Sequence, residues 1–303
     1  MNKKKLWDIL KLILKIGFTV FLLYLVSLKI NFSDVKNLFL KSNPLFILLA
    51  LLTYFLSQVV SSWRLLSFLS SIGLKLNFNF NFRLYLLGMF YNVFLPGGIG
   101  GDGYKIYLLR KKFQHPTKKI FLALFLDRVS GLWAIGFICV ALIILIPKLD
   151  ISPILPIGAL AAGTLIYYLI LKKFFADYSK SFIKAHIKAG MAQSLQLLAV
   201  VFILLSQDFG GKFSPYLFSF LVSSIATIIP VSVGGFGIRE YVMTHASGVF
   251  NMNQNLAVFI TITFSLLSTI AALPGIWFVY RSKEFEPLPT PEEAKEKTDE
   301  LIS

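Results

Sequence analysis

Long apolar runs, separated by short polar segments, dominate the chain. A helix that crosses a bilayer needs about 20 consecutive, mostly apolar residues. The runs that meet this requirement predict six full-length membrane helices, at roughly 7–28, 44–63, 120–146, 153–175, 189–207 and 256–280. The pattern therefore predicts an all-α, polytopic integral membrane protein.

Two further apolar stretches, 84–104 and 214–250, do not fit as single helices because Pro and Gly interrupt them at 96–101 and 230–235. Pro removes a backbone hydrogen-bond donor and Gly lowers helix propensity. We expect each stretch to form a re-entrant helical hairpin that returns to the side from which it entered. An alternative count of eight spans treats the second stretch as two thin helices.

The two interruptions carry the same pattern, P-x3-G-G-x-G-x-[KR]-x-Y. It matches Pro96, Gly100, Gly101, Gly103, Lys105 and Tyr107 in the first copy, and Pro230, Gly234, Gly235, Gly237, Arg239 and Tyr241 in the second. With six full spans, the two copies enter from opposite faces, as an inverted repeat would.

Paired interrupted helices point to a transporter's binding site, because half-helix N-termini direct unpaired N–H groups and positive dipole ends at one spot. An anion would be stabilised there. The competing interpretation is that the glycines only allow close helix packing.

Composition and charge agree with a membrane location. Hydrophobic residues make up 56% of the 303 residues and mean hydropathy is +0.73, more than one soluble domain of this size could bury. The net charge is +15, but the basic residues lie between apolar runs and not on a soluble patch, so we expect no nucleic-acid partner.

The basic residues instead predict orientation. With the N-terminus inside, 21 of the 30 Lys and Arg fall in inside segments and five in outside segments. The positive-inside rule then predicts a cell-membrane protein with both termini in the cytoplasm. We expect a membrane domain over 1–283 and a short charged cytoplasmic tail over 284–303.

Charged residues in or near the apolar runs are the candidate binding residues. Asp127 and Arg128 lie inside the third predicted span, where a lipid-exposed charge would cost about 2.5–3.5 kcal/mol. Because adjacent helical residues point about 100° apart, we expect each to find a partner elsewhere, beside the Gly loops. The substrate-binding candidates are Arg64, Asn92, Gly100, Gly101, Asp102, Lys105, Asp127, Arg128, Gly234, Gly235, Arg239 and Glu240.

Two other interpretations of these residues stay open. The charges could form a structural ion-pair network. Arg64, which follows Trp63 at the end of the second predicted span, could be an interface anchor that reaches lipid phosphates.

Other chemistry has little support in the sequence. Cys139 is the single cysteine and lies in an apolar run, where it reads as a small packed hydrophobe. The three His residues lack metal-site spacing, and no nucleotide-binding or hydrolase motif is present. We expect no catalytic residue, no metal and no cofactor.

Three segments resemble the transmembrane flippase region of the lysylphosphatidylglycerol synthetase (MprF-type) family. They are Asn92-x3-Pro96-Gly97-x2-Gly100-Gly101-Asp102-x2-Lys105, Asp127-Arg128-x2-Gly131 and Pro230-x3-Gly234-Gly235-x-Gly237-x-Arg239-Glu240, with Trp63-Arg64 as a weaker fourth. The resemblance covers roughly Leu6 to Tyr280. The family usually has Arg where this chain has Lys105; a role based on charge survives that change, but bidentate phosphate binding would not.

In full-length members of that family, a cytoplasmic C-terminal domain transfers lysine from lysyl-tRNA to phosphatidylglycerol, and the membrane region moves the product to the outer leaflet. Residues 284–303 leave no room for such a domain, so the resemblance implies the translocation half alone. It implies a flippase-like translocase of an anionic or aminoacylated phospholipid, or of another lipid-linked headgroup, acting in lipid metabolism and antibiotic resistance. Expected partners are membrane phospholipids and, in addition, a separate synthetase or glycosyltransferase.

Two alternatives remain: a phosphatidylglycerol lysyltransferase, and a membrane scaffold that transports nothing.

Overall fold

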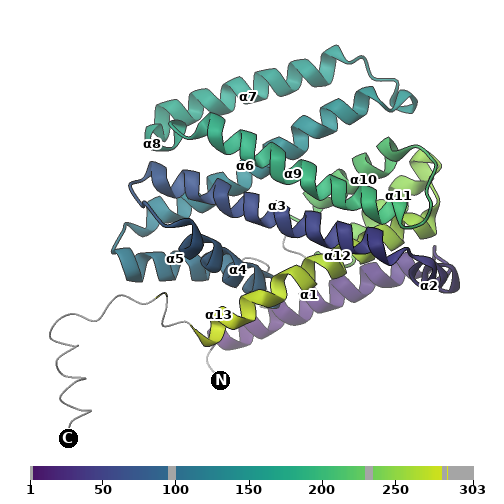
Figure 1. Cartoon of the computed structure of the whole chain (residues 1–303), viewed down its shortest axis with the longest axis horizontal. Helices are drawn as coiled ribbons and strands as arrows, with labels where there is room; N and C mark the ends of the chain where they lie inside the picture. The colour runs from purple at the N-terminus through teal and green to yellow at the C-terminus, as the bar shows by residue number, and fades with distance from the viewer. Residues whose placement is uncertain (1–2, 95–99, 229–234, 282–284, 286–303) are drawn as a thin grey trace, which may run out of the picture.

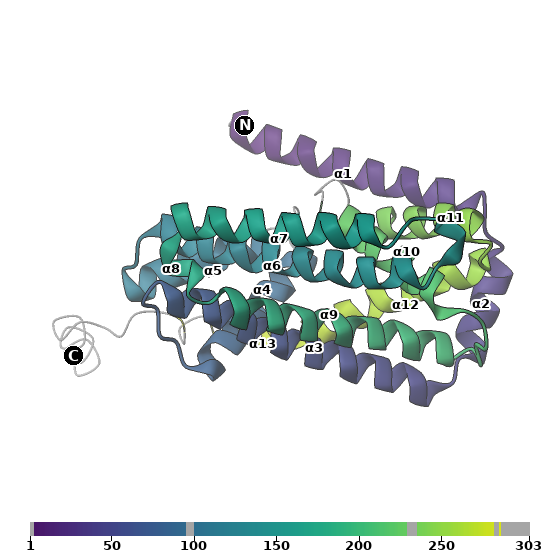
Figure 2. The same cartoon turned by 90° about the horizontal axis from the view of Figure 1, so that it is seen from above.

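The structure is a computed structural model that describes residues 3–94, 100–228, 235–281 and Phe285. Over these ranges the regular structure is helical, and no strand occurs. The long helices run side by side along one axis and form an elongated bundle (Figures 1 and 2). This confirms the predicted all-α, polytopic architecture.

Five helices in the described ranges are long and apolar enough to cross a membrane. They are α3 (Pro44–Ser71), α6 (Thr117–Ile144), α7 (Ile154–Phe174), α9 (Phe182–Leu205) and the continuous unit of α12 (Gln254–Ala272), η2 (Leu273–Gly275) and α13 (Ile276–Tyr280). A sixth span arises if α1 (Lys3–Ser27) is joined to α2 (Phe32–Lys41), which is bent by 90° relative to it. The short elements η1 (Pro147–Leu149) and α8 (Ala176–Ser179) connect spans.

The N-termini of several helices follow from local capping chemistry. The side chain of Asn43 accepts a hydrogen bond from the Leu45 amide at 3.0 Å, and Pro44 occupies the first turn of α3. Asn253 caps α12 in the same way, through the Leu256 amide at 3.0 Å. These asparagines set where the spans begin.

The predicted boundary of α9 was wrong by seven residues, because the helix begins at Phe182 and not at 189. Its first turns carry charge, and Lys188 is stabilised against α3. The Lys188 ammonium donates to Ser67 Oγ at 2.7 Å and lies 4.0 Å from the Trp63 ring centroid. Paired in this way, a charged turn can continue an apolar helix.

The two interrupted stretches form helical hairpins at opposite ends of the bundle (Figures 1 and 2). One consists of α4 (Phe78–Phe94) and α5 (Gly100–Phe113), and the other of α10 (Phe213–Ala226) and α11 (Ile238–Phe250). The longest of these helices, α4, has 17 residues, or about 26 Å at 1.5 Å per residue, which is less than a hydrocarbon core of about 30 Å. The hairpins therefore enter the bundle without crossing it, as predicted.

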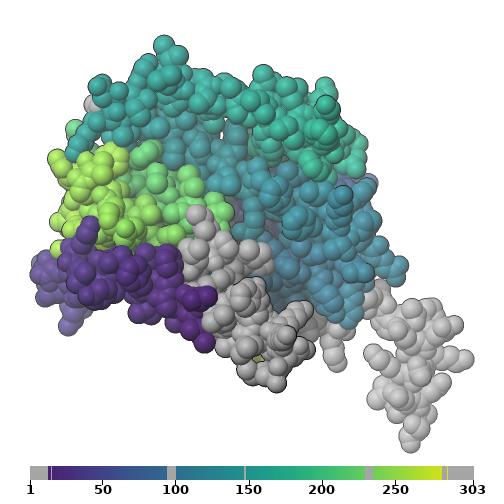
Figure 3. All heavy atoms as spheres, turned by 180° about the vertical axis from the view of Figure 1, so that it is seen from behind, coloured from purple at the N-terminus to yellow at the C-terminus, as the bar shows by residue number. Residues whose placement is uncertain are grey.

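The helix α1 lies along the second hairpin, where the purple N-terminal segment contacts the green and yellow segments in Figure 3. Gly237 makes this approach possible, since a Cβ atom there would lie 3.0 Å from the Thr19 carbonyl oxygen. The opposite face of α1 is apolar and exposed, at Ile13, Val20 and Phe21 for example. Lipid is the solvent that suits such a face.

The predicted tail starts with a packed residue. Phe285 is 1% exposed, and its ring lies 5.5 Å from that of Phe80 and 6.3 Å from that of Phe278. The expectation that the solvated tail begins at 284 is therefore wrong at Phe285, because an aromatic ring gains more from burial against the first hairpin than from solvation. The rest of the predicted tail lies outside the described residues.

Candidate functional site

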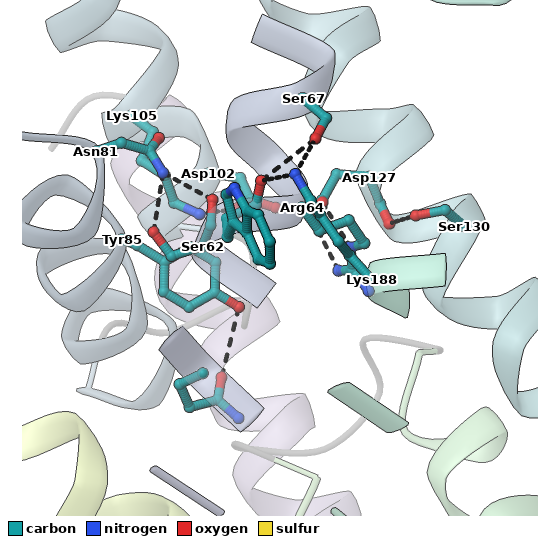
Figure 4. A network of polar contacts seen from close by, with 12 residues as sticks. Ser62, Arg64, Ser67, Asn81, Tyr85, Asp102, Lys105, Asp127, Ser130 and Lys188 are labelled. Carbon is teal, nitrogen blue, oxygen red and sulfur yellow. Dashed lines mark hydrogen bonds and ion pairs between the residues drawn. The ribbon is translucent and has the colours of Figure 1, made fainter. Parts of the chain in front are cut away.

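A buried ion pair joins the second and third predicted spans. Arg64 on α3 donates from Nε to Asp127 Oδ1 at 2.7 Å and from Nη2 to Asp127 Oδ2 at 3.0 Å. The two side chains are 10% and 11% exposed. Gly131, one turn after Asp127, leaves room for the guanidinium, because a Cβ there would lie 3.2 Å from Arg64 Nη1. Figure 4 shows the pair in its polar network.

This geometry corrects one expectation. Arg64 points into the bundle and is 9% exposed, so it is not an interface anchor that reaches lipid phosphates. The reason is electrostatic: Asp127 inside the bundle needs a counter-ion, and the bidentate pair satisfies both groups at once.

A second cluster forms where α5 begins. Asp102, in the first turn of α5, accepts from Lys105 Nζ at 2.9 Å through Oδ1. Its Oδ2 lies 2.5 Å from both Nε and Nη2 of Arg128 on α6. A carboxylate in the first turn of a helix is also stabilised by the helix dipole. Asp127 and Arg128 thus have separate partners, as the 100° argument predicted, but only Arg128 finds its partner beside a Gly loop, since Asp127 pairs with Arg64 on α3.

The first hairpin is shaped to bring these charges together. A Cβ at Gly101 would lie 1.9 Å from the Gly88 carbonyl oxygen, so α4 and α5 touch there through backbone atoms. A Cβ at Gly88 would lie 2.2 Å from Lys105 Cε, so the lysine side chain crosses α4 at this glycine. Asn92 Oδ1 accepts from the Gly101 amide at 2.9 Å and holds the turn into α5.

A cavity of about 280 Å³, the first lobe, opens beside these charges. A second lobe of about 210 Å³ shares four lining residues with it: Gln58, Arg64, Tyr85 and Arg128. Asn92, Asp102, Lys105 and Asp127 also line the first lobe, and Gln193, Gln196 and Ser224 line the second. The charged residues of two ion-pair clusters therefore surround one polar space between α3, α4, α5, α6 and α9.

Arg128 differs from the other cations of this cavity. Its side chain is 49% exposed, whereas the side chains of Arg64 and Lys105 are 10% and 7% exposed. Three cations and two carboxylates leave the cluster with a net charge of 3 − 2 = +1. Arg128 is therefore the cation of this cluster that a ligand can contact most readily.

The second hairpin does not contribute its predicted residues to this cavity. Arg239 and Glu240 are absent from the walls of both lobes, although Ser268 on α12 and Ser224 on α10 line them. Glu240 Oε2 instead accepts from the Gly237 amide at 2.7 Å and caps α11. Arg239 and Glu240 thus lie outside the walls of these two lobes, and the expectation that Arg239 acts together with Lys105 and Arg128 at one site stays a prediction.

The remaining candidates are glycines with structural positions. Gly100 and Gly101 lie in the first turn of α5, and Gly235 has a φ of +82°, which favours glycine. Gly234 lies outside the described residues. Within the described ranges, no group of three His, Cys, Asp or Glu residues is placed to bind a metal.

Two residues that shape the site were not among the candidates. The Tyr85 ring lies 4.9 Å from Lys105 Nζ and lines both lobes, but it follows Leu84 in an apolar helix and has no distinctive sequence context. Gly88 does carry a signal, since an isolated glycine inside a helical pattern often marks a close approach.

Together, the spans, the interrupted hairpins at opposite ends and the charged cavity define a multi-pass membrane protein of the interrupted-helix type, a class in which transporters are common. Residues 12–275 match the family described as the lysylphosphatidylglycerol synthase TM region, so the chain belongs to that family. Comparison with curated proteins gives no match.

Proposed function

We propose that the protein is a lipid translocase of the cell membrane, which moves an anionic phospholipid headgroup, or an aminoacylated one, between leaflets. The headgroup enters the polar cavity while the acyl chains stay in lipid. Both termini lie in the cytoplasm in this proposal, because the basic residues still favour that side. After the buried Arg64 and Lys105 are removed from the earlier count, 21 − 2 = 19 inside residues remain against five.

The half-exposed guanidinium of Arg128 is the observation that carries the proposal. Asp102 orients it at 2.5 Å but leaves further N–H donors toward the cavity. The net charge of +1 matches one phosphodiester, which carries a single negative charge. A charge-assisted hydrogen bond in such a site contributes about 1.5–3 kcal/mol.

The other two cations have supporting roles. Arg64 forms an ion pair with Asp127, and Lys105 lies between Asp102 and the Tyr85 ring. Lys105 acts as a point charge here, which explains why a lysine is sufficient at that position. Lys105 holds Asp102, which in turn orients Arg128, so Lys105 is a positioning residue; Arg64 with Asp127 joins α3 to α6.

The size of the first lobe also fits a headgroup. A cavity of about 280 Å³ has room for many water molecules, since about 10–15 Å³ of such volume is enough for one. This volume suits a phosphoglycerol group and is too small for two acyl chains. Aminoacyl groups would extend into the second lobe, where Gln193 and Gln196 offer hydrogen bonds.

The test is leaflet exchange of fluorescent phospholipids in proteoliposomes, with anionic, zwitterionic and lysylated headgroups compared. Arg128→Ala is expected to slow exchange about 10- to 100-fold, the kinetic equivalent of about 1.5–3 kcal/mol. Lys180→Ala is the matched control, since that cation is 75% exposed on the surface. Exchange no faster than in protein-free vesicles, for all three headgroups, would refute the proposal.

A further inference from the structure

Arg239 on α11 occupies an unusual environment for a cation. Its guanidinium carbon lies 5.1 Å from the ring centroids of both Phe220 and Phe264. The two rings are themselves 4.6 Å apart in an edge-to-face arrangement. Nη1 of Arg239 is buried and has no hydrogen-bond partner. Because a buried donor without a partner destabilises a protein, this nitrogen can gain a hydrogen bond from an incoming acceptor.

The internal repeat shows what Arg239 lacks. Arg239 and Lys105 each lie nine residues after the proline of their copy. Three residues before Lys105 stands Asp102, its counter-ion at 2.9 Å, but three residues before Arg239 stands Phe236. Aromatic faces therefore stabilise the second cation together with the adjacent carboxylate of Glu240, which acts on it through space and not as a salt-bridge partner of this kind.

A chain of aromatic contacts leads from the cavity to Arg239. Tyr54 lines the first lobe, and its ring packs edge-on against Phe264 at 5.1 Å. Phe264 in turn covers the Arg239 guanidinium. Phe220 and Phe264 are 0% and 4% exposed, so this layer is closed in the present conformation.

The energies favour opening of this layer when an anion arrives. A charge-assisted hydrogen bond is typically stronger than a cation–π contact, and it would also satisfy Nη1. A phosphate can therefore replace one aromatic face of Arg239. The same phosphate would gain less by displacing the Tyr85 ring from Lys105, because Asp102 already forms an ion pair with that cation.

We propose that Arg239, Phe220 and Phe264 form a second anion site, which takes the lipid phosphate in turn after Arg128 and is closed by the two rings in this conformation. The inference rests on the proposed translocation. Two cations used in sequence avoid one deep binding site from which the headgroup would leave slowly. Arg128, on α6, lies beside the first hairpin through its contact with Asp102, and Arg239 lies within the second hairpin.

The first experiment separates binding from exchange. In a Cys139→Ala background, Arg239→Cys is expected to bind short-chain phosphatidylglycerol within threefold of the parent protein in detergent, but to slow leaflet exchange at least tenfold. Arg128→Ala is expected to lose both. Treating the Arg239→Cys variant with aminoethyl methanethiosulfonate adds a cation to its thiol and is expected to restore at least a third of the exchange rate. The uncharged propyl reagent is expected to restore none.

Arg239→Lys and Arg239→Met form a second pair that both fill the space between the rings. The lysine variant is expected to keep at least a third of the exchange rate and the methionine variant less than a tenth. Equal rates in the two variants, rescue by the propyl reagent, or binding lost as fully as in Arg128→Ala would overturn the second site. If the parent protein itself exchanges no lipid, the proposed function fails. If the parent exchanges lipid and Arg239→Met is equally active, only the second site fails.

Discussion

The buried pair of Arg64 and Asp127 allows a sharp test of which charges support the fold and which act on a ligand. We consider Asp127→Leu, Arg64→Met and the double variant. Each single change leaves one charge inside the bundle without its bidentate partner, which is 2.7 and 3.0 Å away in the intact protein. The double change replaces both charges by apolar side chains of similar length.

The expected magnitudes follow from burial. Both side chains are about 10% exposed, so solvent screens the pair little, and breaking such a pair costs about 3–5 kcal/mol. Arg64 lines the cavity and can gain some hydration there, so Asp127→Leu is expected at the lower end, about 3 kcal/mol. The double variant avoids the stranded charge and is expected to unfold within about 1 kcal/mol of the parent protein.

The measurement is the free energy of unfolding in detergent micelles for the four proteins of this cycle, together with leaflet exchange in proteoliposomes. A coupling energy of at least about 3 kcal/mol is expected. Exchange by the double variant is expected to stay within threefold of the parent, because Arg128 and Asp102 are unchanged. Additive single effects, within about 0.5 kcal/mol, would refute the structural role of the pair. A stable double variant without exchange would instead place Arg64 or Asp127 on the ligand.

Two further predictions concern packing. Gly101→Ala is expected to destabilise the first hairpin and abolish exchange, because its Cβ would lie 1.9 Å from the Gly88 carbonyl oxygen. The control is Gly103→Ala, which has open space around it and is expected to be neutral or to stabilise by up to about 1 kcal/mol. The free energies of unfolding of the two variants in micelles are compared. Phe285→Ala is expected to cost about 3–5 kcal/mol in the same assay, because the ring is 1% exposed, and Tyr280→Ala, whose side chain is 84% exposed, is the control that should change little. Stability of Phe285→Ala equal to that of the control would show that its packing contributes nothing.

The spans could be predicted from sequence because, in a membrane, the length of an apolar run is nearly enough to identify a spanning helix. The errors lie at the ends, where charged residues find partners on other helices. Lys188 extends α9 through Ser67 and Trp63, and such a contact between residues 121 positions apart leaves no local trace. The bent helix α2 was missed because its ten residues are shorter than a span.

The candidate site was predicted in composition but not in pairing. Intramembrane charges are costly wherever they lie, so Asp127 and Arg128 stand out in the sequence. Which cation pairs with which carboxylate depends on how the helices are rotated and crossed. For that reason the sequence leaves Arg64 open between a ligand contact and an interface anchor, although it is the partner of Asp127, and it does not reveal that two aromatic rings pack against Arg239.

The two copies of the repeat show how one pattern gives two structures. In the first copy, Asn92 accepts from the Gly101 amide, and the helix begins at Gly100. The equivalent of Asn92, 134 residues later, is Ala226, which has no side-chain acceptor. The second copy has Glu240 where the first has Ile106, and this carboxylate accepts from the Gly237 amide, so α11 begins only at Ile238.

The acceptor of the exposed amides therefore comes from the preceding helix in one copy and from the following helix in the other. As a consequence, α11 begins at the equivalent of Tyr104, four positions later in the repeat than α5, which begins at Gly100. An exchange of the two acceptors, Asn92→Ala with Ile106→Glu, would move the start of α5 toward Tyr104 and draw Asp102 out of the first turn that presents it to Lys105 and Arg128. Two positions per copy thus set where α5 and α11 begin, and the earlier start of α5 is what places Asp102 in a first helical turn beside Lys105 and Arg128.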